Sequence, residues 1–179
     1  MTLMRKYDFK ASASVGIWSV LDIPEKKRER GRKLERVYFA PAFERTTSFT
    51  TTSDTIELLI HNAYFDICEI SARWARQELK HLQDSMKGYG IVSIMYMTVE
   101  QEMNERRLQL YRSYFNDVIA EKKANAFQEW RLLFDKLLNG SKEWTTKPEE
   151  CYRLMIGKPI EDGYIKAPEV VGPLFEKEK

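Results

Sequence analysis

The chain of 179 residues carries 29 lysines and arginines against 27 aspartates and glutamates, and 43% of its residues are hydrophobic, which is ordinary for one soluble domain with a sizeable core. No run of eighteen apolar residues occurs, which excludes a membrane-spanning helix, and residues 1–8 lack the apolar core of a signal peptide. We therefore expect a cytoplasmic protein, or one within a virion.

Residues 1–53 have the pattern of an extended arm. Two runs rich in β-branched and aromatic residues, 16–21 and 36–40, are separated by a polar stretch, which predicts a β-hairpin or a small sheet. A third extended run, residues 45–52, is rich in threonine and buries little. We expect it at a sheet edge or against a neighbouring chain.

The stretch between the two predicted strands, residues 26–36, is strongly basic. It holds seven cations against two acids, and residues 1–53 hold eleven against six, so the arm is positive by five while the whole chain is positive by two. Such a loop favours contact with a phosphate backbone or with an acidic partner surface, and a solvated loop without a ligand is the third interpretation. The candidate contact residues are Lys26, Lys27, Arg28, Arg30, Arg32, Lys33 and Arg36.

Residues 54–139 predict a long antiparallel helical hairpin. An apolar stripe from Ile56 to Trp74, with alternating steps of four and three residues, indicates the first helix. Asp54 is the expected N-cap of this helix, and Gly88 is expected to end it.

The first helix is apolar on a second side as well. Leu58, Leu59, Tyr64 and Phe65 lie opposite the main stripe. This pattern predicts that the N-terminal half of the helix is covered on more than one side.

The apolar link of residues 89–97 predicts a short strand or a plug between the helix ends. A capping-box pattern at residues 98–101 then begins the second helix, and Asn139–Gly140 ends it. Unbroken, this helix measures roughly 60 Å, against a diameter of about 40 Å for a compact chain of this length. The polar gap around Lys122 therefore marks either a break or the middle of a rod that projects toward a partner.

Residues 140–179 predict smaller elements. A proline in the first turn and Gly157 at the end predict a short helix over residues 147–156. Asp162–Gly163 predicts a hairpin turn, and from Ala167 onward the tail has no regular pattern. The whole chain thus predicts one domain, mainly α (α+β), in which a long antiparallel helical hairpin carries a small N-terminal β-hairpin or sheet and an irregular C-terminal tail.

The residues show no signature of catalysis. Phosphate-binding glycine loops, dinucleotide fingerprints, zinc-protease motifs and nucleophile elbows do not occur. Glu57 and His61 stand four residues apart without a third metal ligand nearby. Cys68 and Cys151 are not in a metal-type spacing and are expected to be reduced. We predict no cofactor and no metal.

These features predict a non-enzymatic assembly or interaction protein, viral or structural, that acts as a subunit of a larger complex or particle. Its partner would be a second copy of the chain or another protein. The alternative is a nucleic-acid-binding protein that uses the loop 26–36. An enzyme whose class leaves no motif is the third hypothesis.

Overall fold

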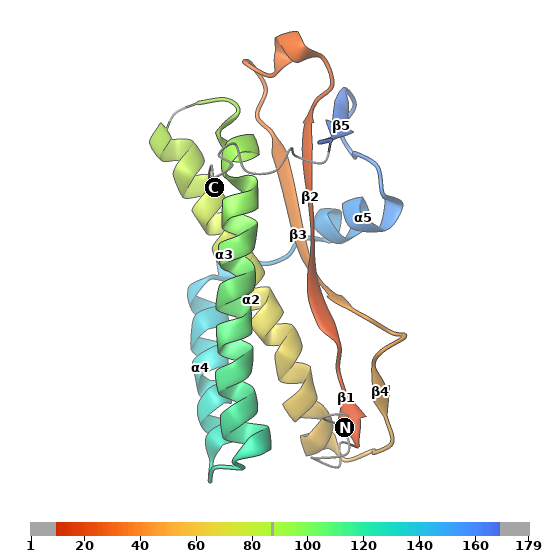
Figure 1. The fold of residues 1–179 in the computed structure, drawn as a ribbon, viewed down its shortest axis with the longest axis vertical. Helices are drawn as coiled ribbons and strands as arrows, with labels where there is room; N and C mark the ends of the chain where they lie inside the picture. Colours follow the sequence, from red (N-terminus) through yellow and green to blue (C-terminus); the bar gives the residue numbers. More distant parts are fainter. Residues whose placement is uncertain (1–9, 87, 169–179) are drawn as a thin grey trace, which may run out of the picture.

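The structure is a computed structural model that describes residues 10–86 and 88–168, and its fold is α+β, as the sequence predicts. Figure 1 shows an elongated molecule in which a long β-ribbon lies along one side of a helical hairpin. The turn of the ribbon lies at one end of the long axis, and the start of the first helix lies at the other. The two ends therefore expose different parts of the sequence.

The ribbon consists of β2, Val15–Pro24, and β3, Arg36–Phe43. The two strands are antiparallel, with Trp18 opposite Ala40, so the predicted hairpin is confirmed. A single turn of 3-10 helix, η1, Lys27–Glu29, lies in the loop that joins them.

A third strand, β5, Tyr164–Lys166, pairs with β2 opposite Asp22–Pro24. The hairpin predicted around Asp162–Gly163 is wrong. Gly163 does turn the chain, with a φ of 78°, but the strand that follows pairs with β2. A turn signal locates the bend, whereas the partner of the next strand depends on distant parts of the chain.

A separate pair of short strands lies beyond the start of the ribbon. β1, Ala11–Ser12, pairs with β4, Phe49–Thr50. Of the threonine-rich run 45–52, only the two residues of β4 form a strand, with β1 as their neighbour in the described sheet.

Helix α2, Thr55–Met86, is the longest helix of the described chain, and Asp54 caps it as predicted. The Asp54 carboxylate accepts hydrogen bonds from the N–H groups of Ile56 at 2.8 Å and Glu57 at 3.3 Å. The cap satisfies two amides that have no partner inside the helix.

Helix α3, Ile91–Tyr114, follows a turn at Gly90, whose φ is 86°, and completes the hairpin. The prediction of a strand or plug at residues 89–97 is wrong, and the capping pattern at residues 98–101 lies inside the helix. Burial is the reason, because Val92 of this stretch packs into the main hydrophobic cluster. A local cap is worth about 1 kcal/mol and is outweighed by several buried side chains.

The predicted second helix breaks near Lys122, so the alternative of a projecting rod is wrong. A π-helical segment, η2, Phe115–Ala120, follows α3, and Lys122 and Asn125 then take φ angles of 49° and 60°. Helix α4, Ala126–Gly140, packs back against α2. A partner helix therefore cannot be inferred from the length of the rod.

Aromatic side chains hold the folded-back helix. Tyr114 is fully buried, and its ring contacts those of Tyr64, Trp130 and Phe134 edge-on or tilted, at centroid distances of 5.6 to 5.8 Å. Its hydroxyl donates to the carbonyl of Ile60 at 2.6 Å. Such pairs stabilise beyond their buried area, so this cluster joins α2, α3 and α4.

Helix α5, Pro148–Ile156, lies on the side of the ribbon away from the hairpin (Figure 1), close to its predicted bounds. A 3-10 turn, η3, Lys142–Trp144, precedes it. The Glu150 carboxylate accepts a hydrogen bond from the Lys147 N–H at 2.8 Å, and Gly157, with a φ of 69°, ends the helix. The ribbon thus lies between α5 and the helical hairpin.

Buried ion pairs connect α5 to the ribbon and to the helical hairpin. Arg153 of α5 donates two hydrogen bonds of 2.5 Å to the Asp22 carboxylate of β2, and both residues are 1% exposed. Nearby, Arg76 of α2 donates to Glu150 of α5 and to the carbonyl of Trp144, each at 2.7 Å. The Arg76 and Arg153 pairs tie α5 to the helical hairpin and to the ribbon.

Removing one partner of the Asp22–Arg153 pair should destabilise the fold strongly. Arg153→Met leaves a buried carboxylate without a counterion, and we expect the free energy of unfolding to fall by about 3 to 5 kcal/mol. Urea unfolding measures this. The matched control is Lys80→Met, which removes an exposed pair with Asp84 and should cost less than about 1 kcal/mol. Equal losses for the two variants would contradict the prediction.

Candidate interaction groove

The basic loop predicted as a binding site lies at the tip of the ribbon (Figure 1). Three of its seven cations already have partners inside the chain. Arg30 donates through Nε to the carbonyl of Pro24 at 3.0 Å. Lys33 forms a salt bridge of 2.9 Å with Glu29, and Arg36 forms one of 2.7 Å with Glu161.

The other four cations of the loop are exposed, and none forms a salt bridge with a residue that the structure describes. They are Lys26, Lys27, Arg28 and Arg32. The loop therefore presents a small positive surface that can attract an anionic polymer through charge. Lys27 and Arg28 belong to the turn η1, and Lys26 and Arg32 stand on either side of it in the sequence.

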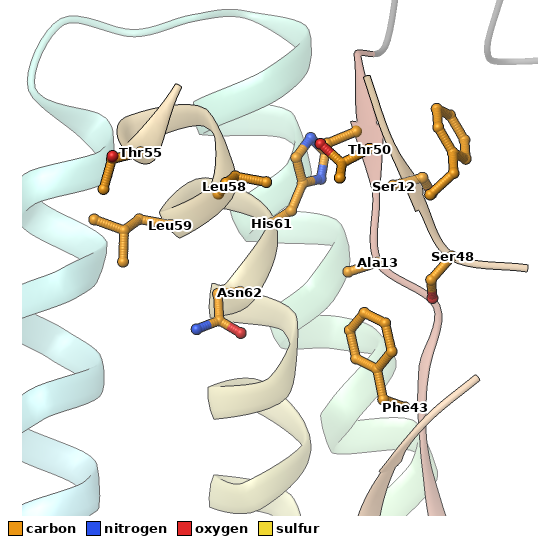
Figure 2. A pocket seen from close by; sticks show the side chains of 12 residues that line it. Ser12, Ala13, Phe43, Ser48, Thr50, Thr55, Leu58, Leu59, His61 and Asn62 are labelled. Carbon is orange, nitrogen blue, oxygen red and sulfur yellow. The ribbon is translucent and has the colours of Figure 1, made fainter. Parts of the chain in front are cut away.

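A second feature, not among the sequence-predicted site residues, lies at the opposite end of the molecule. A cavity of about 530 Å³ opens between the first turns of α2 and the strands β1 and β4. Figure 2 shows Leu58, His61 and Asn62 on α2, with Ser12, Thr50 and Phe43 around the facing strands. We call this cavity and its rim the groove.

The groove lies among large apolar side chains that are exposed to water. Phe43, Phe49, Leu58 and Leu59 line it, and Ile56 on the same turns of α2 is 64% exposed. Leu59 is 49% exposed. Of the four residues on the second apolar side of α2, Tyr64 is buried, whereas Leu58, Leu59 and Phe65 are exposed. The prediction that this side is covered is therefore wrong for these three residues in the single chain.

Hydroxyl groups in the groove wall are engaged within the chain. Ser48 donates through Oγ to the carbonyl of Glu44 at 2.6 Å and accepts from the N–H of Ser14 at 3.0 Å. Thr50 donates to the carbonyl of Thr52 at 2.9 Å. What the groove offers a ligand is mainly apolar surface, which suits a hydrophobic side chain better than a reacting group.

His61 is the titratable residue of the groove wall. It is buried, and Figure 2 shows its ring directed from α2 toward Thr50. Burial lowers the pKa of His61 because desolvation disfavours the imidazolium, while the Glu57 carboxylate acts in the opposite direction. A neutral imidazole keeps this wall uncharged near neutral pH.

Possible metal ligands, two thiols and the long helices remain in the part of the chain that the structure describes. It holds no group of three or more His, Cys, Asp or Glu side chains that could bind a metal ion, so Glu57 and His61 gain no third ligand. Cys68 is buried, Cys151 is exposed, and both are free thiols. None of the described helices is long and apolar enough to cross a membrane.

Comparison of the chain with models of protein families, with curated proteins and with solved structures gives no match. The candidate site therefore depends on geometry and chemistry alone. The signal that could have located it was the second apolar side of the first helix, at Leu58, Leu59 and Phe65. Phe43 and Phe49 gave no separate signal, since single aromatic residues at strand ends are common.

Lowering the pH should destabilise the fold through His61. Its pKa is lowered in the folded chain, whereas the unfolded chain keeps the ordinary value of about 6.5. Between these two values only the unfolded chain binds the proton, so the free energy of unfolding falls as the pH drops below about 6.5 and levels off below the folded pKa.

Urea unfolding across pH 7 to 5 measures this effect. His61→Gln should flatten the pH dependence in this window, and His81→Gln, which changes the exposed histidine of α2, should leave it in place. Parallel curves for the natural chain and His61→Gln would contradict the assignment.

Proposed function

We propose that this chain is a non-enzymatic structural subunit that associates with a second copy of itself through the groove. The supporting observation is the gathering of exposed large apolar side chains around one cavity at one end of the molecule. Soluble monomers rarely keep such a patch in water. Covering it removes apolar surface at about 25 cal/mol per Å².

The charges near the groove are compatible with self-association. Lys10, Glu44, Arg45, Asp54 and Glu57 stand within two residues of lining residues and comprise two cations and three acids. Because neither sign dominates strongly, two identical surfaces related by a two-fold axis do not meet as like-charged patches. Two-fold dimers are also the commonest closed assemblies of identical chains.

Leu59→Asp should weaken self-association at least about tenfold, since it places a carboxylate in the middle of the apolar contact. Leu59 is half exposed, so the substitution should leave the monomer folded. Size-exclusion chromatography with light scattering over a wide range of protein concentrations measures the change.

The matched control is Leu132→Asp, which alters a 72% exposed leucine of α4 outside the groove lining. This variant should associate like the natural chain. A natural chain that stays monomeric at the highest concentration, or equal weakening by the two substitutions, would reject the proposed dimer.

Nucleic-acid binding is the second candidate function, and a separate observation favours it. The four exposed cations of the loop lie at the tip of the ribbon, at the opposite end from the groove. A dimer joined through the groove would leave this loop accessible. Its cations could then displace counterions from a phosphate backbone without competing with the dimer contact.

Neutralising the four exposed cations should weaken binding to duplex DNA and lower its salt dependence. The slope of log K against log salt should fall by about 3 to 4, because each lost phosphate contact removes about 0.9. Fluorescence anisotropy at several salt concentrations measures both quantities.

The control replaces four other exposed lysines by glutamine. They are Lys80, Lys136, Lys142 and Lys158. If the control variant loses as much affinity as the loop variant, the attraction comes from net charge and the loop is no binding site.

A further inference from the structure

The three-stranded sheet has two edges, and the β3 edge is blocked at Phe39 and Pro41. The N–H of Phe39 donates to the Glu150 carboxylate at 3.4 Å, and the carbonyl of Phe39 accepts from Arg76 at 2.5 Å. Two residues along, Pro41 has no N–H to offer. Side-chain caps and proline are the devices by which edge strands avoid unwanted pairing.

The β2 edge is covered over part of its length only. β5 pairs with Asp22–Pro24, and Figure 1 shows it beside the end of β2 nearest the basic loop. The next backbone group, the carbonyl of Leu21, accepts from the N–H of Ala167 at 2.8 Å. At the other end of the strand, the carbonyl of Val15 accepts a weak hydrogen bond from the Cys68 thiol.

Between these ends, no described residue pairs with the backbone of β2 on the side away from β3. Along an antiparallel strand, alternate residues direct both backbone groups to the same side, so Ile17 and Ser19 point away from β3, as Leu21 does. Among the described residues, neither Ile17 nor Ser19 makes a backbone hydrogen bond on that side. Unlike the β3 edge, the stretch Val15–Leu21 contains no proline and no charged residue.

The face of the sheet at Gly16 is free of described atoms. A Cβ built on Gly16 would meet no described atom within 4 Å. Trp18 is 53% exposed on the face of the ribbon that α5 covers farther along. An added strand would therefore find both unpaired backbone groups and an aromatic surface to cover.

A carboxylate lies next to the middle of the open edge. The hydroxyl of Ser19 donates to the Glu100 carboxylate of α3 and accepts a hydrogen bond of 2.8 Å from the hydroxyl of Tyr96. Glu100 forms no salt bridge with any residue in the described ranges. A cation on a neighbouring strand would supply that missing partner.

We propose that an extended segment of a partner protein adds to the sheet as a strand along Val15–Leu21. Its backbone pairs with Ile17 and Ser19, an apolar side chain covers Trp18, and a lysine or arginine opposite Ser19 meets Glu100. This is strand addition, in which main-chain hydrogen bonds supply affinity and alternate side chains supply specificity. The proposed surface is separate from the groove and does not depend on self-association there.

Charge disfavours two other segments as the added strand: a second copy of β2 and the chain's own continuation after β5. A second β2 strand, paired across a two-fold axis near Trp18, would bring two Glu100 carboxylates together. The chain's own continuation in the register of β5 would set Glu169 opposite Ser19, again beside Glu100. Like charges directly opposite one another destabilise strand pairs, so a basic partner segment fits best.

The test uses the full chain and a nine-residue peptide of alternating threonine and valine with a central lysine. Amide hydrogen exchange, followed by NMR, should show fast exchange at Ile17 and Ser19 in the free protein and slow exchange at Trp18 and Val20, which pair with β3. Adding the peptide should slow Ile17 and Ser19 by at least about tenfold. A peptide N-methylated at alternate residues, which cannot pair, should have no effect.

Charge selection gives an independent readout. The lysine peptide should bind about threefold to tenfold more tightly than the same peptide with a central glutamate. Glu100→Gln should abolish this difference, with thermal unfolding as the check that the variant is folded.

Three outcomes would overturn the proposal. The lysine peptide could fail to protect Ile17 and Ser19. The Ile17 and Ser19 amides could already exchange slowly without peptide at every protein concentration, which would identify the chain's own continuation as the paired strand. Their exchange could become slow only as protein concentration rises, which would identify a second copy of the chain as the paired strand.

Discussion

Two arginines, Arg76 and Arg153, join the helical hairpin, the ribbon and α5 to one another. Arg153 neutralises Asp22 inside the protein, and Arg76 joins α2 to Glu150 and to the edge of β3. Buried charges are costly unless they are paired and fully hydrogen-bonded, so each of these contacts requires the others to be in position. They place α5 at one location on the ribbon, and that location decides which part of the sheet remains uncovered.

Local patterns predicted the elements whose signals lie within a few residues. The Asp54 cap, the ribbon between its two β-rich runs and the end of α5 at Gly157 all follow from short-range chemistry. The start of α3 does not, because Val92 enters the core only when the ribbon is present to receive it. The partner of β5 likewise depends on where Arg153 anchors α5, which no local pattern encodes.

The break after α3 illustrates the same limit. The polar gap near Lys122 indicated a break, yet the opposite interpretation, an unbroken rod, satisfied the helical periodicity equally well. Packing of Tyr114 favours the break, because its ring is fully buried only when Trp130 and Phe134 fold back onto it. Helical periodicity predicts which residues are buried, whereas tertiary packing determines which parts of the chain cover them.

The candidate sites were predictable to different degrees. Charge is visible in any sequence, so the basic loop was found, but only the structure separates its four exposed cations from the three that are paired. The groove was visible as a second apolar side of α2, and the sequence could not say that this side would remain uncovered. The open edge of β2 was not predicted, because residue types do not show how far a neighbouring strand extends along its partner.

The open edge of β2 has a geometric cause. β2 has ten residues and spans about 33 Å, whereas α5 has nine residues and spans about 14 Å, and β5 adds three. Neither can cover the whole ribbon. The buried Asp22–Arg153 pair holds α5 against the part of the ribbon that β5 also borders. In the remaining half of the ribbon, no described residue pairs with the outer backbone groups of Ile17 and Ser19. Phe43, the last residue of β3, is 47% exposed and lines the groove. A sheet that is longer than its covering elements leaves surface for other chains, and here that surface is apolar at the end of the ribbon and hydrogen-bonding along its side.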